Sequence, residues 1–311
     1  MHLRIGGDET MPSESNGMAL QIEELYREHK PLLISIAYRM LGSMTEAEDA
    51  VQDVFVSVTK LGGNEIAYPK AYLVKMITNR ILNMMKAAPR KREHYPGPWL
   101  PEPVIELGSK DDLQEHVLRR ERLGYALLVL LQTCTPPERA VFVLRESLSY
   151  DYSDIAAMLN KSEAACRKIY SRAAAKVGQR PRTESESALD DSIEQFVQSF
   201  AQAINTGRFE PFIRLLTEDA VMLSDGGGVV RAALNPIYGR NRIAAFFVGI
   251  SGKGSLAGQL HHVWISGQRG LILLRESRPP IAFTIEPDDD FSAIRAIYLV
   301  SNPEKLTRIT E

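Results

Sequence analysis

The chain has 311 residues, 44% of them hydrophobic and 24% charged, which suits a globular protein of two or three domains and excludes wholesale disorder. Its formal net charge of −2 leaves no overall basic field, so any surface for nucleic acid has to be local. Cys134 and Cys166 lie too far apart for a disulfide framework or a zinc-ligand spacing, and they favour a reducing cytoplasm. No stretch approaches the ~20 apolar residues of a membrane helix, so we expect no contact with a membrane.

The amino-terminal part predicts a flexible leader followed by a first helical domain. Residues 1–18 are rich in glycine, proline and serine, which predicts the leader. Over residues 22–40 apolar side chains recur at helical spacing, and Gly42 is expected to end that helix. We assign residues 19–92 to the first domain.

Two more helices are predicted inside the first domain. Thr45 and Glu48 have the spacing of a capping box, which predicts a helix that starts at Thr45, with an apolar stripe over residues 47–58. The glycines of residues 62–64 interrupt the pattern, and a third helix is predicted to start near Pro69.

Residues 93–111 are predicted to be a linker, because four prolines within residues 96–103 fix the backbone and remove amide donors. Helices are expected to resume over residues 112–132. Thr135 and Glu138 then form a second capping-box pattern, with proline between them at a tolerated position. We assign residues 112–180 to a second all-α domain.

The second domain has the pattern of a helix-turn-helix. Ile155 and Leu159 give a short helix an apolar face, Asn160 stands where a left-handed turn is needed, and Ser162 is placed to cap the next helix. The outer face of that next helix is basic, which suits phosphates and base edges in a major groove. The alternative is a solvated basic face on a generic helix pair. The residues expected to contact DNA here are Ser162, Arg167, Lys168, Arg172 and Lys176.

Another basic cluster lies in the third helix of the first domain, where no acidic residue stands between residues 75 and 92. Aromatic rings stack on an unpaired base, amides bind its edge and cations bind its phosphates, so this mixture predicts a site for melted DNA. The alternative is a basic helix end that faces water. The residues expected at the site are Tyr72, Lys75, Asn79, Arg80, Asn83 and Lys86.

The last third of the chain changes from helical to mixed patterning. Residues 181–189 are polar and predict a second linker, and residues 190–311 predict an α+β domain with a curved antiparallel sheet. Helices are expected over residues 193–205 and 242–248, and strands over residues 220–223, 260–265, 271–274, 281–285 and 294–300.

Residues 32–43 and 47–55 are similar to the polymerase-binding region of the extracytoplasmic-function sigma factors of the sigma-70 family. Members of that family direct RNA polymerase to promoters. The resemblance implies that Asp49, Gln52 and Asp53 bind the clamp helices of the polymerase largest subunit. It implies no catalytic residue, no cofactor and no metal.

The resemblance continues through both DNA-binding patterns. Residues 71–83 resemble the family's reader of the minus-ten promoter element, and residues 119–178 resemble its reader of the minus-thirty-five element. Tyr72 stands where the family often has Trp, and Asn83 where it often has Asp. The first difference keeps an aromatic ring, and the second bears on the preferred base.

Three short motifs resemble the signatures of the sigma-J-like subgroup, whose members carry a fused SnoaL-like domain instead of relying on a separate anti-sigma protein. Val229 stands where that subgroup often has Lys. We expect the motifs to meet and to hold the DNA-binding domains in one arrangement, so that the third domain regulates the sigma factor in cis. The motif residues are Trp99, Leu100, Pro101, Glu102, Pro103, Asp225, Gly226, Gly227, Gly228, Asn302, Pro303, Lys305 and Leu306.

The fold class that follows is two all-α domains and then an α+β SnoaL-like domain, a cystatin-like cone. The resemblance implies an apolar pocket that could accept a small apolar ligand. The residues that could line it are Asp225, Tyr238, Arg240, His261, His262 and Trp264. The alternative is that no such site forms, because His261 and His262 point to opposite faces of a strand and Asp225, before three glycines, is typical of a turn. Two alternatives to the sigma factor are a ligand-sensing helix-turn-helix regulator and, less favoured, a small-molecule cyclase or isomerase.

Overall fold

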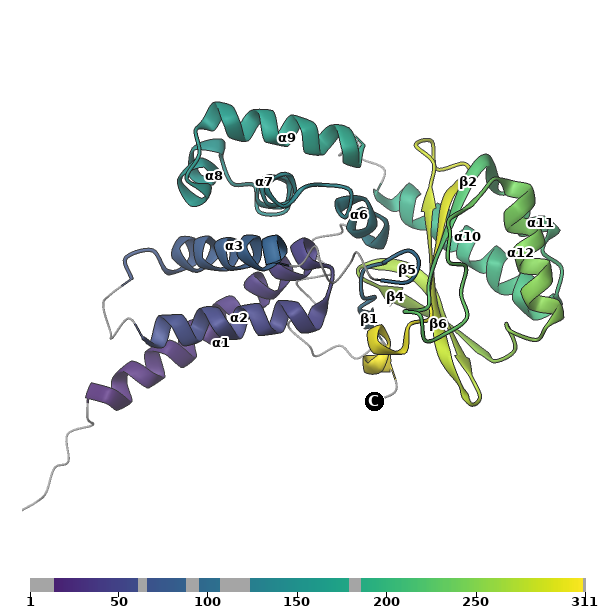
Figure 1. The fold of residues 1–311 in the computed structure, drawn as a ribbon, viewed down its shortest axis with the longest axis horizontal. Coiled ribbons are helices and arrows are strands. Elements are labelled where there is room, and N and C mark those ends of the chain that lie inside the picture. The colour runs from purple at the N-terminus through teal and green to yellow at the C-terminus, as the bar shows by residue number, and fades with distance from the viewer. Residues whose placement is uncertain (1–13, 61–65, 88–94, 107–123, 179–185, 310–311) are drawn as a thin grey trace, which may run out of the picture.

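The computed structural model describes residues 14–60, 66–87, 95–106, 124–178 and 186–309 (Figure 1). Helices α1 to α3 and α6 to α9 make up one half of the molecule, and a sheet covered by α10 to α12 makes up the other. The first thirteen residues, the two ends of the predicted linker (residues 93–94 and 107–111) and the start of the helical segment expected over residues 112–132 lie outside the described residues.

The first helical unit consists of α1 (Glu14–Leu41), α2 (Met44–Thr59) and α3 (Pro69–Ala87), close to the three predicted helices. α1 begins at Glu14, so the end of the segment predicted to be a flexible leader is helical. Gly42 ends α1 in the left-handed region with φ +75°, as its position in the sequence predicts.

The predicted cap of α2 is wrong by two residues, and the helix begins one residue before Thr45. The helix begins at Met44, and its N-cap is Ser43, whose side chain accepts a hydrogen bond from the Glu46 amide. Serine and threonine are both favoured N-cap residues. Ser43 comes first in the chain, directly after Gly42, so the helix starts there and not at Thr45.

The second helical unit consists of α6 (Gly124–Leu131), α7 (Pro136–Glu146), α8 (Tyr152–Leu159) and α9 (Glu163–Val177). Its predicted local signals are confirmed. The Glu138 carboxylate accepts from the Thr135 amide at 2.8 Å, Asn160 has φ +52°, and Ser162 Oγ accepts from the Ala165 amide at 3.2 Å. α8, the turn and α9 therefore form the expected helix-turn-helix.

The carboxy-terminal domain contains helices α10 (Glu186–Thr206), α11 (Glu210–Ile213) and α12 (Arg240–Gly252). α10 extends back to Glu186, so the end of the second predicted linker is helical. The strands are β1 (Ile105–Glu106), β2 (Leu216–Asp225), β3 (Ile237–Tyr238), β4 (Gln259–Ile265), β5 (Gln268–Arg275), β6 (Arg278–Pro287) and β7 (Ile294–Val300). Two short 3-10 helices follow, η1 (Pro303–Lys305) and η2 (Thr307–Ile309).

The strands form one sheet of order β1-β4-β5-β6-β7-β2-β3, which differs from the expected antiparallel sheet in two ways. β2 and β7 pair in parallel, because the antiparallel meander from β4 to β7 ends with β7 beside β2. β1 comes from the first linker and pairs with the edge strand β4, so the linker itself extends the sheet (Figure 1).

Both faces of the sheet are apolar, and each belongs to a separate core. Successive strand residues point to opposite faces. Ile297 and Leu299 of β7 point into the cone under α10 to α12, whereas Ala296 and Tyr298 join a core shared with both helical units. The helical half is therefore packed directly onto the sheet.

Phenylalanines fill the interior of the cone. The rings of Phe200 and Phe283 stack with centroids 3.7 Å apart, and Phe212 and Phe247 pack against Phe200 at 4.7 and 5.2 Å. Aromatic pairs at such distances contribute beyond their buried area. This cluster anchors α10 and α12 on the sheet.

We expect Phe200→Ala to lower the free energy of unfolding of the carboxy-terminal domain by about 3–5 kcal/mol, because Phe200 is 2% exposed and its loss leaves a cavity. Urea unfolding followed by circular dichroism measures the change. Val248→Ala, at a side chain that is 62% exposed on α12, is the control and should change stability by less than about 0.5 kcal/mol. Equal effects of the two substitutions would contradict the assigned core.

Candidate functional site

The three motifs predicted to meet do lie together, around the carboxylate of Asp225 at the end of β2. This carboxylate is fully buried and pairs with the Lys305 ammonium at 2.8 Å. It also accepts hydrogen bonds from the Leu100 amide at 2.9 Å and the Tyr95 hydroxyl at 2.5 Å. One side chain thus joins the linker, the sheet and the carboxy-terminal tail. We call Tyr95, Trp99, Leu100, Asp225 and Lys305 the interdomain site.

Lys305 makes further contacts within the interdomain site. Its ammonium donates to the Leu100 carbonyl and lies 4.1 Å from the centroid of the Trp99 ring system and 5.1 Å from that of Tyr95. A partly desolvated cation over an aromatic face is attracted by the ring quadrupole. Burial and the neighbouring Asp225 carboxylate raise the pKa of Tyr95, so its hydroxyl stays protonated and donates.

Glycines allow the segments of the interdomain site to approach closely. Gly227 and Gly228 have φ +64° and +75°, and a Cβ on them would lie 2.4 Å from Asn302 and 2.3 Å from Pro96. A Cβ on Gly42 would lie 2.8 Å from the Trp99 ring. Any side chain at these positions would force the linker or the tail to move.

Glu102 ties the linker to the first helical unit. Its buried carboxylate accepts from the Met44 amide at 2.8 Å and from Ser43 Oγ at 3.1 Å, and its amide donates to the Gly42 carbonyl at 2.8 Å. The linker therefore supplies a second cap for the amino terminus of α2, where unpaired amides favour a negative charge.

Buried tyrosines connect the linker to the helices and to the sheet. The Tyr38 hydroxyl donates to the Glu102 carbonyl at 2.6 Å and lies 2.7 Å from Ser266 Oγ. The Tyr125 hydroxyl donates to the Pro101 carbonyl at 2.6 Å. Burial raises the pKa of both phenols, which keeps them protonated as donors. These contacts were not predicted, because nothing in the local sequence marks either tyrosine.

The two helical units are also joined directly. Arg139 of α7 is 2% exposed, and its guanidinium donates to the Met40 carbonyl at the end of α1, 2.6 Å away. A cation at the carboxyl end of a helix is favoured by the helix dipole. Helices α7 and α8 lie against α3 as well. This buried arginine was missed, because its sequence context resembles that of a surface residue.

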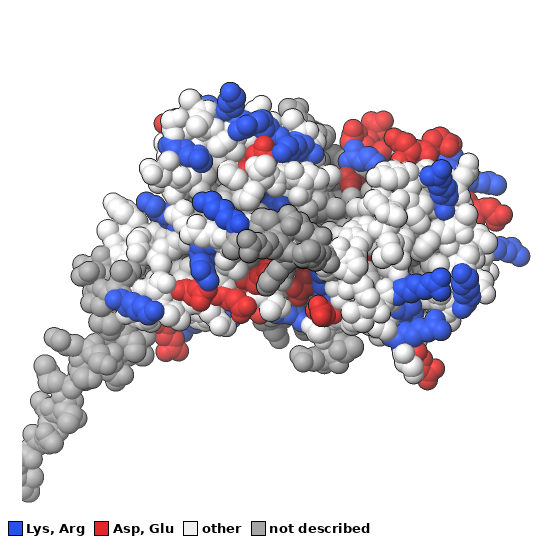
Figure 2. All heavy atoms as spheres, in the orientation of Figure 1, with Lys and Arg blue, Asp and Glu red and all other residues white. Residues whose placement is uncertain are grey.

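The predicted polymerase-binding residues lie on one exposed face of α2. Asp49, Gln52 and Asp53 are exposed, and Val51, Val54 and Phe55 on the opposite face are buried. Figure 2 shows acidic side chains gathered over this helix. Val56 continues the same face and is 52% exposed, an apolar contribution that the sequence analysis missed.

The predicted minus-ten residues lie along α3. Lys75, Asn79, Arg80, Asn83 and Lys86 are exposed and Tyr72 is half-buried. Two of them already have partners. Arg80 pairs with Asp53 of α2 at 2.5 Å, and the Asn79 amide lies 3.5 Å from the Met158 carbonyl of α8. The helix-turn-helix thus contacts the predicted reader of melted DNA.

The predicted minus-thirty-five residues lie on the outer face of α9. Arg167, Lys168 and Arg172 are exposed, and Figure 2 shows cations gathered over this helix. Lys176 pairs with Glu138 at 2.6 Å. Burial alone would raise the pKa of Glu138, but hydrogen bonds from Lys176 and Thr135 lower it overall. The Ser162 hydroxyl caps α9, and Cys166 is fully buried as a packing residue.

The residues expected to line an apolar pocket in the carboxy-terminal domain do not assemble into one. Tyr238, His261 and His262 are exposed, Asp225 belongs to the interdomain site, and the phenylalanine cluster fills the cone. Across the described residues, no group of acidic, histidine or cysteine side chains could hold a metal ion. None of the described helices is long and apolar enough to cross a bilayer.

Two family models match the helical half of the chain. Residues 25–91 match Sigma-70 region 2, and residues 125–177 match Sigma-70, region 4. The chain is 29% identical over 294 residues to the ECF RNA polymerase sigma factor SigJ of Mycobacterium tuberculosis, covering 91% of this chain and 92% of that one. It is 25% identical over 206 residues to the probable ECF RNA polymerase sigma factor SigI of the same species, covering 63% and 67%.

The crystal structure of the extracytoplasmic function sigma factor SigJ of Mycobacterium tuberculosis superposes with a TM-score of 0.71 at 26% identity, over 93% of this chain and 98% of that chain. The chain is therefore a sigma factor of the sigma-70 family, a protein of transcription initiation. Within that family it belongs to the extracytoplasmic-function group and is similar to SigJ along almost its whole length. The predicted family and fold class are confirmed.

We expect Asp225→Asn to loosen the interdomain site, because it removes the charge that compensates buried Lys305. Breaking a buried ion pair costs about 3–5 kcal/mol. Hydrogen exchange at the Leu100 amide, which donates to Asp225, should become at least tenfold faster. Unchanged exchange at this amide would contradict the role assigned to the carboxylate.

Proposed function

We propose that the carboxy-terminal domain regulates this sigma factor in cis by holding both helical units in a closed arrangement. The closed arrangement is the one described above, in which α7 and α8 pack on α1 and α3. Both units share a core with the sheet. The observation that carries the proposal is the buried Asp225 carboxylate, which binds the linker and the tail at once.

The α2 face carries the contact with core RNA polymerase. Asp49, Gln52 and Asp53 present carboxylates and an amide to the clamp helices of the largest subunit, and exposed Val56 adds an apolar contact at the same face. Charged groups of this kind steer association and set orientation more than they add affinity. The protein acts in the cytoplasm, where the polymerase is.

Promoter DNA is bound at two surfaces. α9 positions duplex DNA at the minus-thirty-five element through phosphates and base edges. α3 holds an unpaired base of the minus-ten element, with Tyr72 as a stacking ring and Asn79 and Asn83 as hydrogen-bonding amides. The chain itself carries out no covalent chemistry in this scheme.

The closed arrangement restrains the minus-ten surface. The Asn79 amide faces the Met158 carbonyl at 3.5 Å, so α8 lies where DNA would approach this part of α3. Buried Arg139 holds α7 to the end of α1. Engagement of both promoter elements then requires the two helical units to separate, which the interdomain site opposes.

Substitution of Trp99 tests the regulatory proposal. Trp99→Ala removes the ring over the Lys305 ammonium. A cation–π contact with partial burial is worth about 1 kcal/mol, or roughly a fivefold change in the ratio of open to closed chains. We expect transcription from a cognate promoter with sigma-free core polymerase to rise by roughly that factor at limiting sigma factor.

Trp264→Ala is the matched control, because Trp264 also stacks under a cation, Arg269 at 4.2 Å, but lies outside the interdomain site. It should leave transcription unchanged. Equal transcription by the wild type and Trp99→Ala would contradict the regulatory role. No transcription by any variant, with no binding to core polymerase, would contradict the assignment of α2.

The carboxy-terminal tail gives a second test of regulation. A chain that ends at Leu306 keeps Lys305 but loses the bidentate pair of Arg308 with Glu48 of α2, at 3.2 and 2.6 Å. A chain that ends at Ser301 loses both Lys305 and the pair of Arg308 with Glu48. We expect transcription to increase more for the shorter chain, because only that chain leaves Asp225 without its buried partner. Equal activity of the two chains would exclude a role for residues 302–306.

A further inference from the structure

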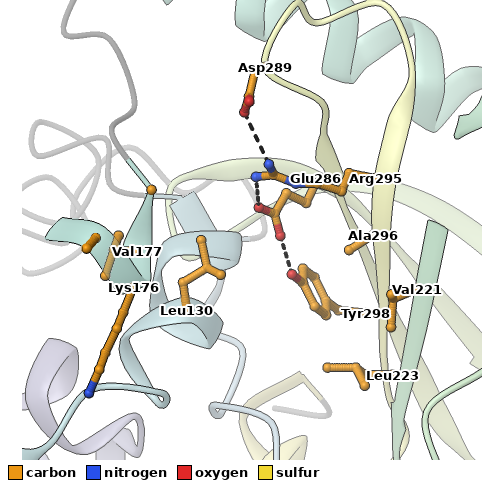
Figure 3. Close-up of a pocket in the computed structure, with 12 residues that line it drawn as sticks. Leu130, Lys176, Val177, Val221, Leu223, Glu286, Asp289, Arg295, Ala296 and Tyr298 are labelled. Atoms are coloured by element: carbon orange, nitrogen blue, oxygen red, sulfur yellow. Dashed lines mark hydrogen bonds and ion pairs between the residues drawn. The ribbon is translucent and has the colours of Figure 1, made fainter. Parts of the chain in front are cut away.

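A cavity of about 420 Å³ lies between the second helical unit and the carboxy-terminal sheet (Figure 3). One wall comes from α6 and the end of α9, including Leu130 and Val177. The other wall comes from β2, β6 and β7, including Val221 and Tyr298. This volume lies within the range of about 300–1,000 Å³ typical of sites for small molecules.

The cavity lies on the opposite side of the sheet from the cone interior. Val221 and Tyr298 point to the helical half, whereas their neighbours Met222 and Ile297 point into the phenylalanine-filled core. The cavity is therefore distinct from the pocket expected inside the SnoaL-like cone.

The walls are mainly apolar, and a buried polar group stands at one end. Leu130, Val177, Val221 and Leu223 provide apolar surface. The Glu286 carboxylate has a side-chain exposure of 3%, accepts from the Tyr298 hydroxyl and pairs with Arg295 at 2.6 Å. Figure 3 shows this carboxylate between its two partners. Glu286 lines the cavity, so a donor on a bound molecule would meet this carboxylate, which can accept several hydrogen bonds at once.

The charges around the cavity compensate one another. Arg295 neutralises Glu286, and the Lys176 ammonium pairs with Glu138 and points away from Glu286 in Figure 3. Asp289 is 88% exposed at the rim. A charged ligand would bring an uncompensated charge against apolar walls, which is costly, so the lining favours a neutral one.

We propose that this cavity binds a small, neutral, largely aromatic or alicyclic molecule that carries one hydroxyl or N–H donor for the Glu286 carboxylate. The apolar body lies between Leu130 and Val177 on one side and Val221 and Leu223 on the other. The donor sets its orientation at the polar end. Burial of apolar surface supplies the affinity, and the single hydrogen bond supplies specificity.

The position of the cavity links the ligand to the closed arrangement. Both walls exist together only while α6 lies on the sheet and the end of α9 faces it, so the ligand binds the closed chain and not the open one. A ligand present at a hundred times its Kd then shifts the ratio of closed to open chains about a hundredfold. This consequence, unlike the binding itself, rests on the proposed regulation in cis.

The test uses N-phenyl-1-naphthylamine, a neutral aromatic amine with one N–H, whose fluorescence rises in apolar sites. Titration into the full chain should give a saturable increase with one equivalent bound. Val221→Trp places a ring in the cavity and should abolish binding. Glu286→Gln removes the charged acceptor and should weaken binding roughly tenfold. Val248→Trp, at a position on α12 that is 62% exposed and outside the cavity, is the matched control.

Absence of saturable binding would overturn the proposal, and so would binding that both cavity substitutions leave unchanged. If Val221→Trp fails to fold by circular dichroism, the affinity of Glu286→Gln decides. The probe should also lower transcription by the wild type and not by Val221→Trp. Cavity-dependent binding without that effect would support the site and would count against regulation in cis.

Discussion

A single buried charge pair, Asp225 with Lys305, organises the contacts between the parts of this molecule. A carboxylate taken out of water is costly unless it is paired and hydrogen-bonded. Asp225 meets that requirement with the neighbouring Gly227 amide, a lysine from the tail, and an amide and a tyrosine hydroxyl from the linker. Because these partners come from separate segments, the carboxylate is satisfied only when linker, sheet and tail are all in place.

The same linker is fixed to the rest of the molecule at two further points that follow the interdomain site in the chain. Glu102 caps α2, which presents the proposed polymerase-binding face, and β1 pairs with the edge strand β4. A change at the interdomain site is therefore transmitted to the start of α2 through a few covalent bonds. The second helical unit closes the assembly through Arg139 of α7. The contact of its helix α8 with α3 is the basis of the effect on DNA binding that we propose.

The sequence predicted what local chemistry determines. Helical periodicity, the left-handed Asn160, the Ser162 cap and the capping box at Thr135 each depend on neighbouring residues, and each was confirmed. The meeting of the three motifs followed from a family resemblance. Pairings set by tertiary structure were missed, including the parallel β2 and β7, the strand formed by the linker, and the buried role of Arg139. The side chains expected to line a pocket in the cone do not converge there. Phenylalanines that lie far apart in sequence fill its interior.

The most direct test is the distance between the two helical units in the free chain. Nitroxide labels at Ser57 of α2 and Ser171 of α9, both exposed, allow that distance to be measured by pulsed electron paramagnetic resonance. The wild type should give one narrow distance distribution. Lys305→Met, which leaves buried Asp225 unpaired, should add a broad component at longer distances. Identical narrow distributions for both proteins would contradict the claim that this charge pair holds the closed arrangement.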